Sequence, residues 1–218
     1  GAGVLKDVDL MVRLTKAVIK GTNLPVTVKT RLGWDENSIN IDEVAERLQD
    51  IGVQALTVHA RTRAQMYKGH SDWSHIARVK NNPRITMPIF GNGDIDSPEK
   101  ALEYKKKYGL DGIMIGRAAI GYPWIFNEIK HYFATGEHLA KPTIHDRVEA
   151  ARNHLTWSMD WKGERLGIVE TRRHYTNYFK GIPNFKEFRT QLVTADDPTK
   201  IFETFDLVEA MFGNLLNV

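Results

Sequence analysis

The sequence predicts an α/β fold, the C-terminal half of a TIM (β/α)8 barrel, followed by an all-helical domain. Two observations carry this prediction. Four short segments rich in β-branched apolar residues are typical of buried parallel strands, and helical patterns lie between them. From Ile144 onward, in contrast, no strand pattern occurs. The expected strands are 25–31, 55–61, 88–94 and 112–117.

The helical patterns between these strands have recognisable ends. Segments 9–20 and 42–50 each end close to a glycine. Ser97 followed by Pro98 is typical of a helix start, with serine as the N-cap and proline at the first helical position, and Gly109 is the expected stop. Strands that alternate with helices predict βα units and a parallel sheet.

The spacing of the strands leaves two architectures open. The strand starts lie 30, 33 and 24 residues apart, close to the repeat of a (β/α)8 barrel, which needs about 250 residues in all. Only four units occur, so the chain holds either half a barrel or a complete small open sheet. The sequence begins with Gly1 rather than methionine, which favours the half barrel and a fragment of a longer protein. The expected domains are residues 1–138 and 139–218.

The second domain is expected to be a bundle of amphipathic helices. The expected helices are 145–159, 164–179, 185–192 and a last one from Asp196. The last helix is expected to bury Ile201, Phe202, Phe205, Leu207, Val208 and Met211. Four more aromatic residues are expected in the core, rather than as base-stacking platforms: Trp157, Trp161, Tyr175 and Tyr178.

The composition excludes several classes of protein. The 218 residues include no cysteine, so disulfide scaffolds, cysteine-ligated zinc or iron–sulfur sites and thiol catalysis by this chain are excluded. No apolar run approaches the roughly 18 residues of a membrane helix, and no signal peptide opens the sequence. The eight histidines lack metal-binding spacing, so no metal is expected. We expect a soluble, cytoplasmic protein with no membrane partner.

Charge is distributed unevenly within the helical part. The net charge of the whole chain is +3, which permits a nucleic-acid partner without requiring one. Residues 141–190 contain ten Lys/Arg against six Asp/Glu, a net charge of +4, whereas residues 191–218 have a net charge of −4. The basic segment is the candidate contact surface.

Polar residues and glycines follow all four expected strands. These are Lys29 and Arg31, then His59 and Arg61, then Asn92, Gly93 and Asp94, then Gly116 and Arg117. Ligands of parallel α/β folds bind beyond the carboxyl ends of the strands. Charged groups there are costly unless they meet a partner, so four such ends suggest a pocket for an anion. Glycine permits close backbone approach, and Gly116 with Arg117 predicts a phosphate cradle at the start of a short helix.

An ordered set of motifs resembles the tRNA-dihydrouridine synthase family over nearly the whole chain. Each motif alone is weak, but together and in order they are specific. They are VTVKTR at 26–31, TVHARTR at 57–63, QMYKG at 65–69 with Asp72 and Trp73, GNGDI at 91–95, DGIMIGR at 111–117, RRH at 172–174, and YFKGIP at 178–183 followed by Arg189.

The resemblance implies a flavin-bearing barrel followed by a helical tRNA-binding domain. Such an enzyme reduces the C5=C6 bond of uridine in tRNA, with FMN as hydride carrier and NADPH or NADH as reductant. The catalytic cysteine of the family would lie upstream of Gly1, so no catalytic residue is assigned and the chain alone is expected to be inactive. The intact protein is expected to be a monomer.

Two sets of residues take roles from this resemblance. The FMN contacts would be Lys29, His59, Asn92, Gly93, Asp94, Gly116 and Arg117. The tRNA contacts would be Arg61, Arg63, Lys68, Arg172, Arg173, Lys180 and Arg189. Each role has a plainer alternative that needs no ligand. Lys29 would form an ion pair, His59 would be a core histidine, residues 92–94 would form a tight turn, and the basic surface residues would be solvated.

Two rival functions stay open at this point. One is another FMN barrel oxidoreductase that acts on a small molecule, similar to dihydroorotate dehydrogenase, although such enzymes lack a basic helical appendix. The other is a non-catalytic RNA-binding module, which flavin absorbance of the purified protein would distinguish from either enzyme.

Overall fold

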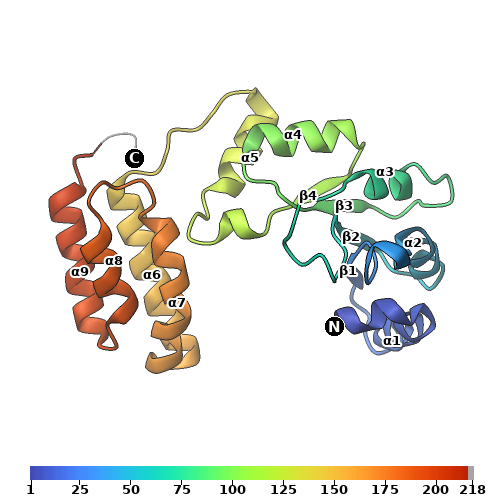
Figure 1. The fold of residues 1–218 in the computed structure, drawn as a ribbon, viewed down its shortest axis with the longest axis horizontal. Helices are drawn as coiled ribbons and strands as arrows, with labels where there is room; N and C mark the ends of the chain where they lie inside the picture. Colours follow the sequence, from blue (N-terminus) through green and yellow to red (C-terminus); the bar gives the residue numbers. More distant parts are fainter. Residues whose placement is uncertain (216–218) are drawn as a thin grey trace. The chain divides into compact units, whose positions relative to one another are not determined.

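A computed structural model describes residues 1–215 and divides the chain into two compact units. The sheet unit comprises Gly1–Arg117, and the helical unit begins at Ala118 (Figure 1). This division lies earlier in the chain than the boundary expected at 138/139, and the helix Ile125–Thr135 falls in the helical unit.

The sheet unit contains four parallel strands in the order β1-β2-β3-β4, so each strand pairs with its neighbour in sequence. The α/β prediction with a parallel sheet is confirmed. The strands are β1 (Thr27–Arg31), β2 (Ala55–His59), β3 (Ile89–Asn92) and β4 (Gly112–Met114). The helices are α1 (Val8–Lys20), α2 (Ile41–Asp50), α3 (Ser74–Lys80) and α4 (Pro98–Lys107), with 3-10 helices η1 (Ala2–Lys6), η2 (Glu36–Ser38) and η3 (Arg117–Ala119), the last of which crosses into the helical unit.

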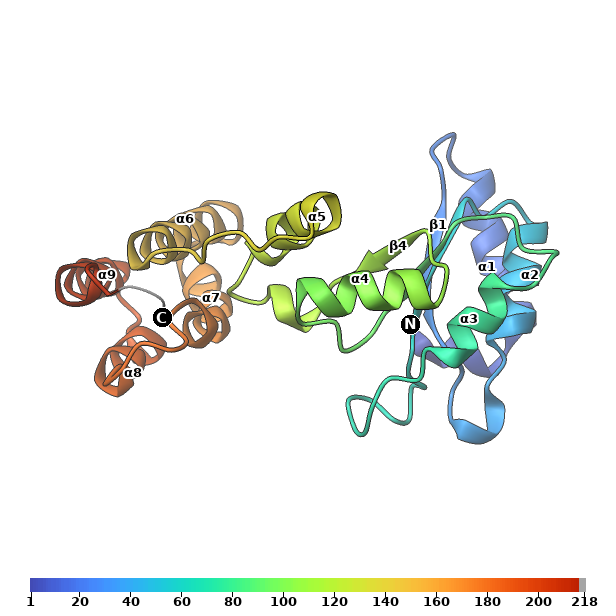
Figure 2. The same cartoon turned by 90° about the horizontal axis from the view of Figure 1, so that it is seen from above.

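The two faces of the sheet differ in chemistry because side chains alternate along each strand. Leu56, Val58 and Ile89 are fully buried on the face covered by helices, and α1, α2 and α3 lie along one side of the strands (Figure 2). The other face, here called the polar face, carries Lys29, Arg31, His59 and Asn92. The sheet therefore buries an apolar surface and presents a cationic one.

The observed strands are shorter than the predicted ones. β1 ends at Arg31 as expected, whereas β2, β3 and β4 each stop before the charged residue expected at their ends. After β3, Gly93 and Asp94 have φ values of 136° and 51°, which an extended strand does not contain. Arg61, Asp94 and Arg117 consequently lie in the connections that follow the strands. The helix start at Ser97 is confirmed, since its side chain accepts a hydrogen bond from Lys100 N at 3.3 Å.

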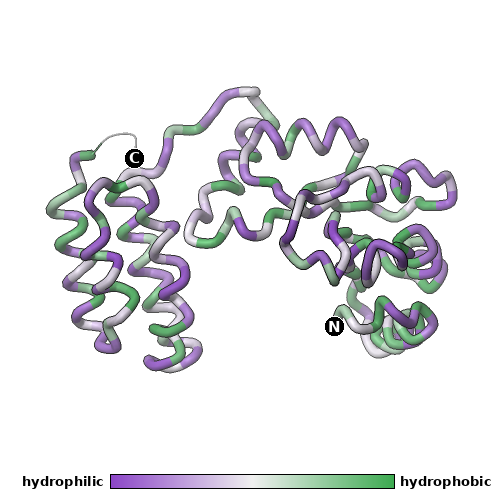
Figure 3. The backbone as a smooth tube through the Cα atoms, viewed as in Figure 1, coloured by the Kyte–Doolittle hydropathy of each residue, from purple (hydrophilic) through white to green (hydrophobic). Residues whose placement is uncertain are grey.

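The helical unit contains helices and no strand within residues 118–215. Figure 3 shows hydrophobic and hydrophilic residues interspersed along the helices, as amphipathic packing requires. The helices are α5 (Ile125–Thr135), α6 (Ile144–Lys162), α7 (Glu164–Tyr178), α8 (Lys186–Thr194) and α9 (Pro198–Phe212). Their buried residues include Leu155, Ile168, Tyr175, Tyr178 and Phe205. No helix within residues 1–215 combines the length and apolarity that crossing a membrane demands.

Four expected core residues are instead exposed. Trp157 and Trp161 are 68% and 81% exposed, while Leu207 and Met211 are 52% and 64% exposed. Leu207 follows the buried Ile201 by six residues, which turns it about two thirds of a turn away from the buried stripe. The core prediction was therefore wrong for these residues, and it is confirmed for Tyr175 and Tyr178.

Candidate functional site

The register of the sheet brings three of the predicted strand ends into one row. Arg31 is paired with His59, His59 with Asn92, and Asn92 with Met114. Lys29 lies two residues before Arg31, on the same face. The Asn92 side chain donates from Nδ2 to the Met114 carbonyl at 2.8 Å, which ties the ends of β3 and β4 together. The polar face thus ends in a row of cationic and amide groups.

Positive charges crowd this row and shift the pKa values of its members. Desolvation and the nearby Arg31 charge lower the pKa of Lys29. Burial, followed by the charges of Arg31, Lys29 and Arg61, lowers the pKa of His59 to about 4. His59 is 8% exposed and therefore neutral at pH 7. A bound anion would relieve the repulsion among these groups, so the row suits a negatively charged ligand.

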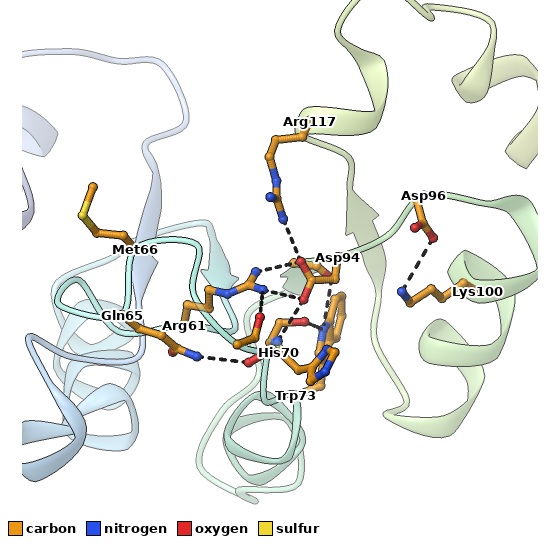
Figure 4. Close-up of polar contacts among 12 residues, drawn as sticks. Arg61, Gln65, Met66, His70, Trp73, Asp94, Asp96, Lys100 and Arg117 are labelled. Carbon is orange, nitrogen blue, oxygen red and sulfur yellow. Dashed lines mark hydrogen bonds and ion pairs between the residues drawn. The ribbon is translucent and has the colours of Figure 1, made fainter. Parts of the chain in front are cut away.

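Asp94 is the centre of a second cluster, beyond the end of β3 (Figure 4). Its carboxylate accepts two hydrogen bonds from Arg61, at 2.8 and 2.7 Å, and one from the Ser71 backbone at 2.9 Å. Arg117 donates a further bond at 2.8 Å. Burial alone would raise the pKa of Asp94, but the bonds from Arg61 and Ser71 outweigh it and hold that pKa well below its usual range. Asp94 therefore binds arginines rather than facing an open ligand site.

Arg61 is a structural residue in this cluster. Its side chain is 2% exposed, and besides Asp94 it donates to the Gly69 carbonyl at 2.7 Å. The expectation that Arg61 holds a tRNA phosphate is therefore corrected, because its guanidinium is enclosed by its own chain. Its Nε is buried and has no hydrogen-bond partner among the described residues.

Arg117 is held in place but stays accessible. Its guanidinium lies between the Asp94 carboxylate and the Tyr67 ring, 4.7 Å from the ring centroid, and its side chain is 55% exposed. The short helix expected after Gly116 is a 3-10 helix of three residues, too short for a helix-terminus anion site. A phosphate site here would rest on the guanidinium and on nearby backbone N–H groups.

Close packing explains two glycines of this region, whereas a third lies beside open space. A Cβ at Gly91 would lie 2.0 Å from the Trp73 ring, and one at Gly93 would lie 2.9 Å from Ser71 Cβ. Close packing accounts for both, so neither requires a ligand. A Cβ at Gly116, in contrast, would meet nothing nearer than Asn92 Nδ2 at 3.8 Å, so the space beside Gly116 is open.

Sequence reasoning missed two supports of this site. The pairing of Arg61 with Asp94 joins residues 33 positions apart, and Tyr67 stacks on Arg117 across a still longer separation. The only available signal was that both charged residues follow neighbouring strands. Arg31 is also used internally, since it donates to the carbonyls of Thr62 and Met66 at 2.8 and 3.3 Å.

The other basic residues expected to contact tRNA differ in exposure. Arg63, Lys68, Arg173, Lys180 and Arg189 are exposed. Arg172 is not free, because it donates to Asp196 at 2.6 Å and to the Ala195 carbonyl at 2.9 Å. Arg172 therefore links α7 to the connection before α9, and its role as a tRNA contact stays a prediction.

The polar face fits a phosphate-bearing anionic cofactor. The cationic row, the accessible guanidinium of Arg117 and the open space at Gly116 supply charge, hydrogen-bond donors and room. Lys29, His59, Asn92 and Arg117 could hold such a group, with Asp94 supporting Arg117. Within residues 1–215, no three His, Asp or Glu side chains are grouped so that they could hold a metal ion.

Comparison with known proteins gives one consistent result. A family model described as "Dihydrouridine synthase (Dus)" matches residues 1–214. A "Probable tRNA-dihydrouridine synthase 1" of Synechocystis is 43% identical over 192 residues, 88% of this chain and 53% of that protein. A "Probable tRNA-dihydrouridine synthase" of Rickettsia conorii is 40% identical over 93% of this chain and 61% of that protein. A "tRNA-dihydrouridine synthase B" of Pseudomonas aeruginosa is 40% identical over 90% and 59%.

The chain spans only part of these relatives. It covers between 53% and 61% of the length of the three proteins described above. The match nevertheless extends over both units of the structure, since it runs to residue 214.

Proposed function

The chain belongs to the dihydrouridine synthase family, and on that premise we propose that the protein containing it reduces the C5=C6 bond of uridine in tRNA. The observation that carries this proposal is the cationic row at the carboxyl edge of the sheet. A family match alone would also fit a chain that had lost its chemistry, whereas crowded basic side chains with lowered pKa values suit an enzyme that binds an anionic cofactor.

We propose FMN as that cofactor and a half barrel as the scaffold. A bound flavin would supply hydride, and NADPH or NADH would reduce the flavin again. Lys29, His59 and Asn92 would hold it along the polar face, and Gly116 with Arg117 would bind its phosphate. Asp94, proposed from the sequence as a direct contact, is better explained as the residue that positions Arg117.

Each residue has a distinct task in this proposal. Lys29 keeps a positive charge on the polar face, where it would stabilise negative charge that develops during reduction. His59 stays neutral at pH 7, so it offers a hydrogen bond rather than a second full charge. The sequence contains no cysteine, so the proton donor implied by the resemblance is not one of these 218 residues.

Both units supply proposed tRNA contacts. Arg173, Lys180 and Arg189 are exposed on it, and Arg63 and Lys68 are exposed on the sheet unit. Neutralising phosphates releases counterions, so tRNA binding should weaken steeply as salt rises. The target base must also leave its stack to meet the cofactor, at a cost of a few kcal/mol.

A Lys29→Ala variant of the intact protein tests the catalytic part of this proposal. We expect it to retain flavin absorbance but to form dihydrouridine at least about ten-fold more slowly, because about 1.4 kcal/mol of charge stabilisation corresponds to a factor of ten. Lys16→Ala, on α1, is the matched control. Equal rates for Lys29→Ala and the wild type would contradict the role of Lys29, and a colourless intact protein would contradict flavin dependence.

A further inference from the structure

A pocket lies between α6 and α7 in the helical unit. Its volume is about 220 Å³. Gly163, with φ of 80°, joins the two helices directly, and a Cβ on Gly167 would come within 2.6 Å of the Met159 backbone. The helices are therefore close together at this end. The lining residues are His154, Trp157, Ser158, Trp161, Lys162, Glu170, Arg173 and His174.

Two indole rings line this pocket and remain exposed. Trp157 and Trp161 are four residues apart, so they lie on the same side of α6. They are 68% and 81% exposed, whereas Trp73 in the sheet unit is 1% exposed. Neighbouring exposed aromatic rings are a common feature of binding surfaces, since their faces remain available for stacking.

The charges of the pocket are arranged around these rings. The Lys162 ammonium lies 4.6 Å from the Trp161 ring centroid and pairs with Glu170, which neutralises the pocket's one carboxylate. Arg173 is exposed, and no ion pair to it is found within residues 1–215. The net charge that a ligand meets is therefore positive.

The two histidines add flat, neutral surface. Their rings lie edge to face, with centroids 4.5 Å apart. Burial, then His154 and Arg173, lowers the pKa of His174 to about 4. Burial and the charges of Arg173 and Lys162 also lower the pKa of His154. Arg173 Nε donates to His174 Nε2 at 3.2 Å, which holds the guanidinium at the pocket wall.

We propose that this pocket binds one unpaired nucleobase of the tRNA, stacked on Trp157 or Trp161, with an adjacent phosphate at Arg173. This inference rests on the proposed function and adds a base contact on the helical unit to the proposed phosphate contacts. Aromatic faces stack on any base, and arginine pairs with phosphate. The volume is below the roughly 300–1,000 Å³ of sites that enclose drug-sized ligands, which suits a single planar base.

Alanine variants of the intact protein test the pocket. We expect alanine at the tryptophan that stacks on the base, tested as Trp157→Ala and Trp161→Ala, to weaken equilibrium tRNA binding by about five- to 150-fold, the range for loss of one base–aromatic stack. The slope of log affinity against log salt should not change, because no phosphate contact is removed. Arg173→Gln should instead reduce that slope by about one. Leu207→Ala, at an exposed apolar residue of α9, is the matched control.

Tryptophan fluorescence and a phenylalanine variant test base stacking directly. A short single-stranded oligouridylate should quench the tryptophan fluorescence of the intact protein, and Trp157→Phe should retain part of the lost tRNA affinity. Wild-type affinity in both tryptophan variants would overturn the pocket, even if the protein forms dihydrouridine normally. Indoles inaccessible to acrylamide in the RNA-free protein would also overturn it, because another part of the protein would then cover the site. Absence of tRNA binding by the wild type would instead overturn the proposed function.

Discussion

Replacing Asp94 by asparagine tests how the strand ends are held together. The substitution keeps the size of the side chain but removes the charge that meets Arg61 and Arg117. Arg61 is 2% exposed and would remain buried without a counter-charge. In asparagine an amide NH₂ group replaces one carboxylate oxygen. A hydrogen-bond donor would then face the N–H donors of Arg61 and Arg117, where the carboxylate oxygen accepts.

The structure sets the expected size of this effect. Removal of one partner from a buried ion pair costs about 3–5 kcal/mol. Asp94 is itself 20% exposed and keeps one acceptor oxygen as asparagine, so we take the lower limit, about 3 kcal/mol. For a domain of about 150–250 residues each kcal/mol shifts Tm by about 2–4 °C, which gives a decrease of about 6–12 °C.

Thermal and urea unfolding of the intact protein measure this loss. Asp96→Asn is the matched control, because Asp96 is 73% exposed and its contact with Lys100 is long, at 3.6 Å. Such exposed pairs contribute about 0–1 kcal/mol, so the control should unfold almost like the wild type. Similar unfolding midpoints for Asp94→Asn and Asp96→Asn would refute the reasoning that Asp94 holds Arg61.

Two further predictions concern stability. His59 binds a proton more readily when unfolded, near its ordinary pKa of 6.5, than when folded, where its pKa is about 4. Stability should therefore fall as pH decreases from about 6.5 to 4, and His59→Gln should flatten that slope in urea titrations at several pH values. Arg172→Ala should lower Tm through loss of the bonds to Asp196 and the Ala195 carbonyl, with an unchanged salt slope of tRNA binding. A stable Arg172→Ala variant with a reduced salt slope would instead show that Arg172 contacts a tRNA phosphate.

Local patterns in the sequence predicted the elements that depend on local chemistry. Ser97 and Pro98 begin α4 as expected, because capping involves neighbouring residues only. α3 was missed because it has seven residues and buries only Ile76 and Val79, too few for a periodic pattern. α5 was also missed, although Gly136 marks its end in the left-handed conformation.

Long-range contacts could not be predicted in the same way. Hydrophobicity suggests that tryptophans are buried, but only the packing of α6 against α7 decides that Trp157 and Trp161 face outward. Likewise, the strand ends predicted a cationic site, while the partners of Arg61 and Arg172 come from distant segments. The residue types were therefore predictable, and the division between ligand contacts and internal supports was not.

The central position of Asp94 also constrains the order of events during synthesis. The connection after β2 contains Arg61 and Ser71, both of which bond to a carboxylate that leaves the ribosome more than twenty residues later. Until β3 and Asp94 have emerged, the Arg61 guanidinium lacks the carboxylate with which it pairs in the folded structure. We therefore expect this connection to become ordered together with the third βα unit, and its protection from proteases should arise at that stage.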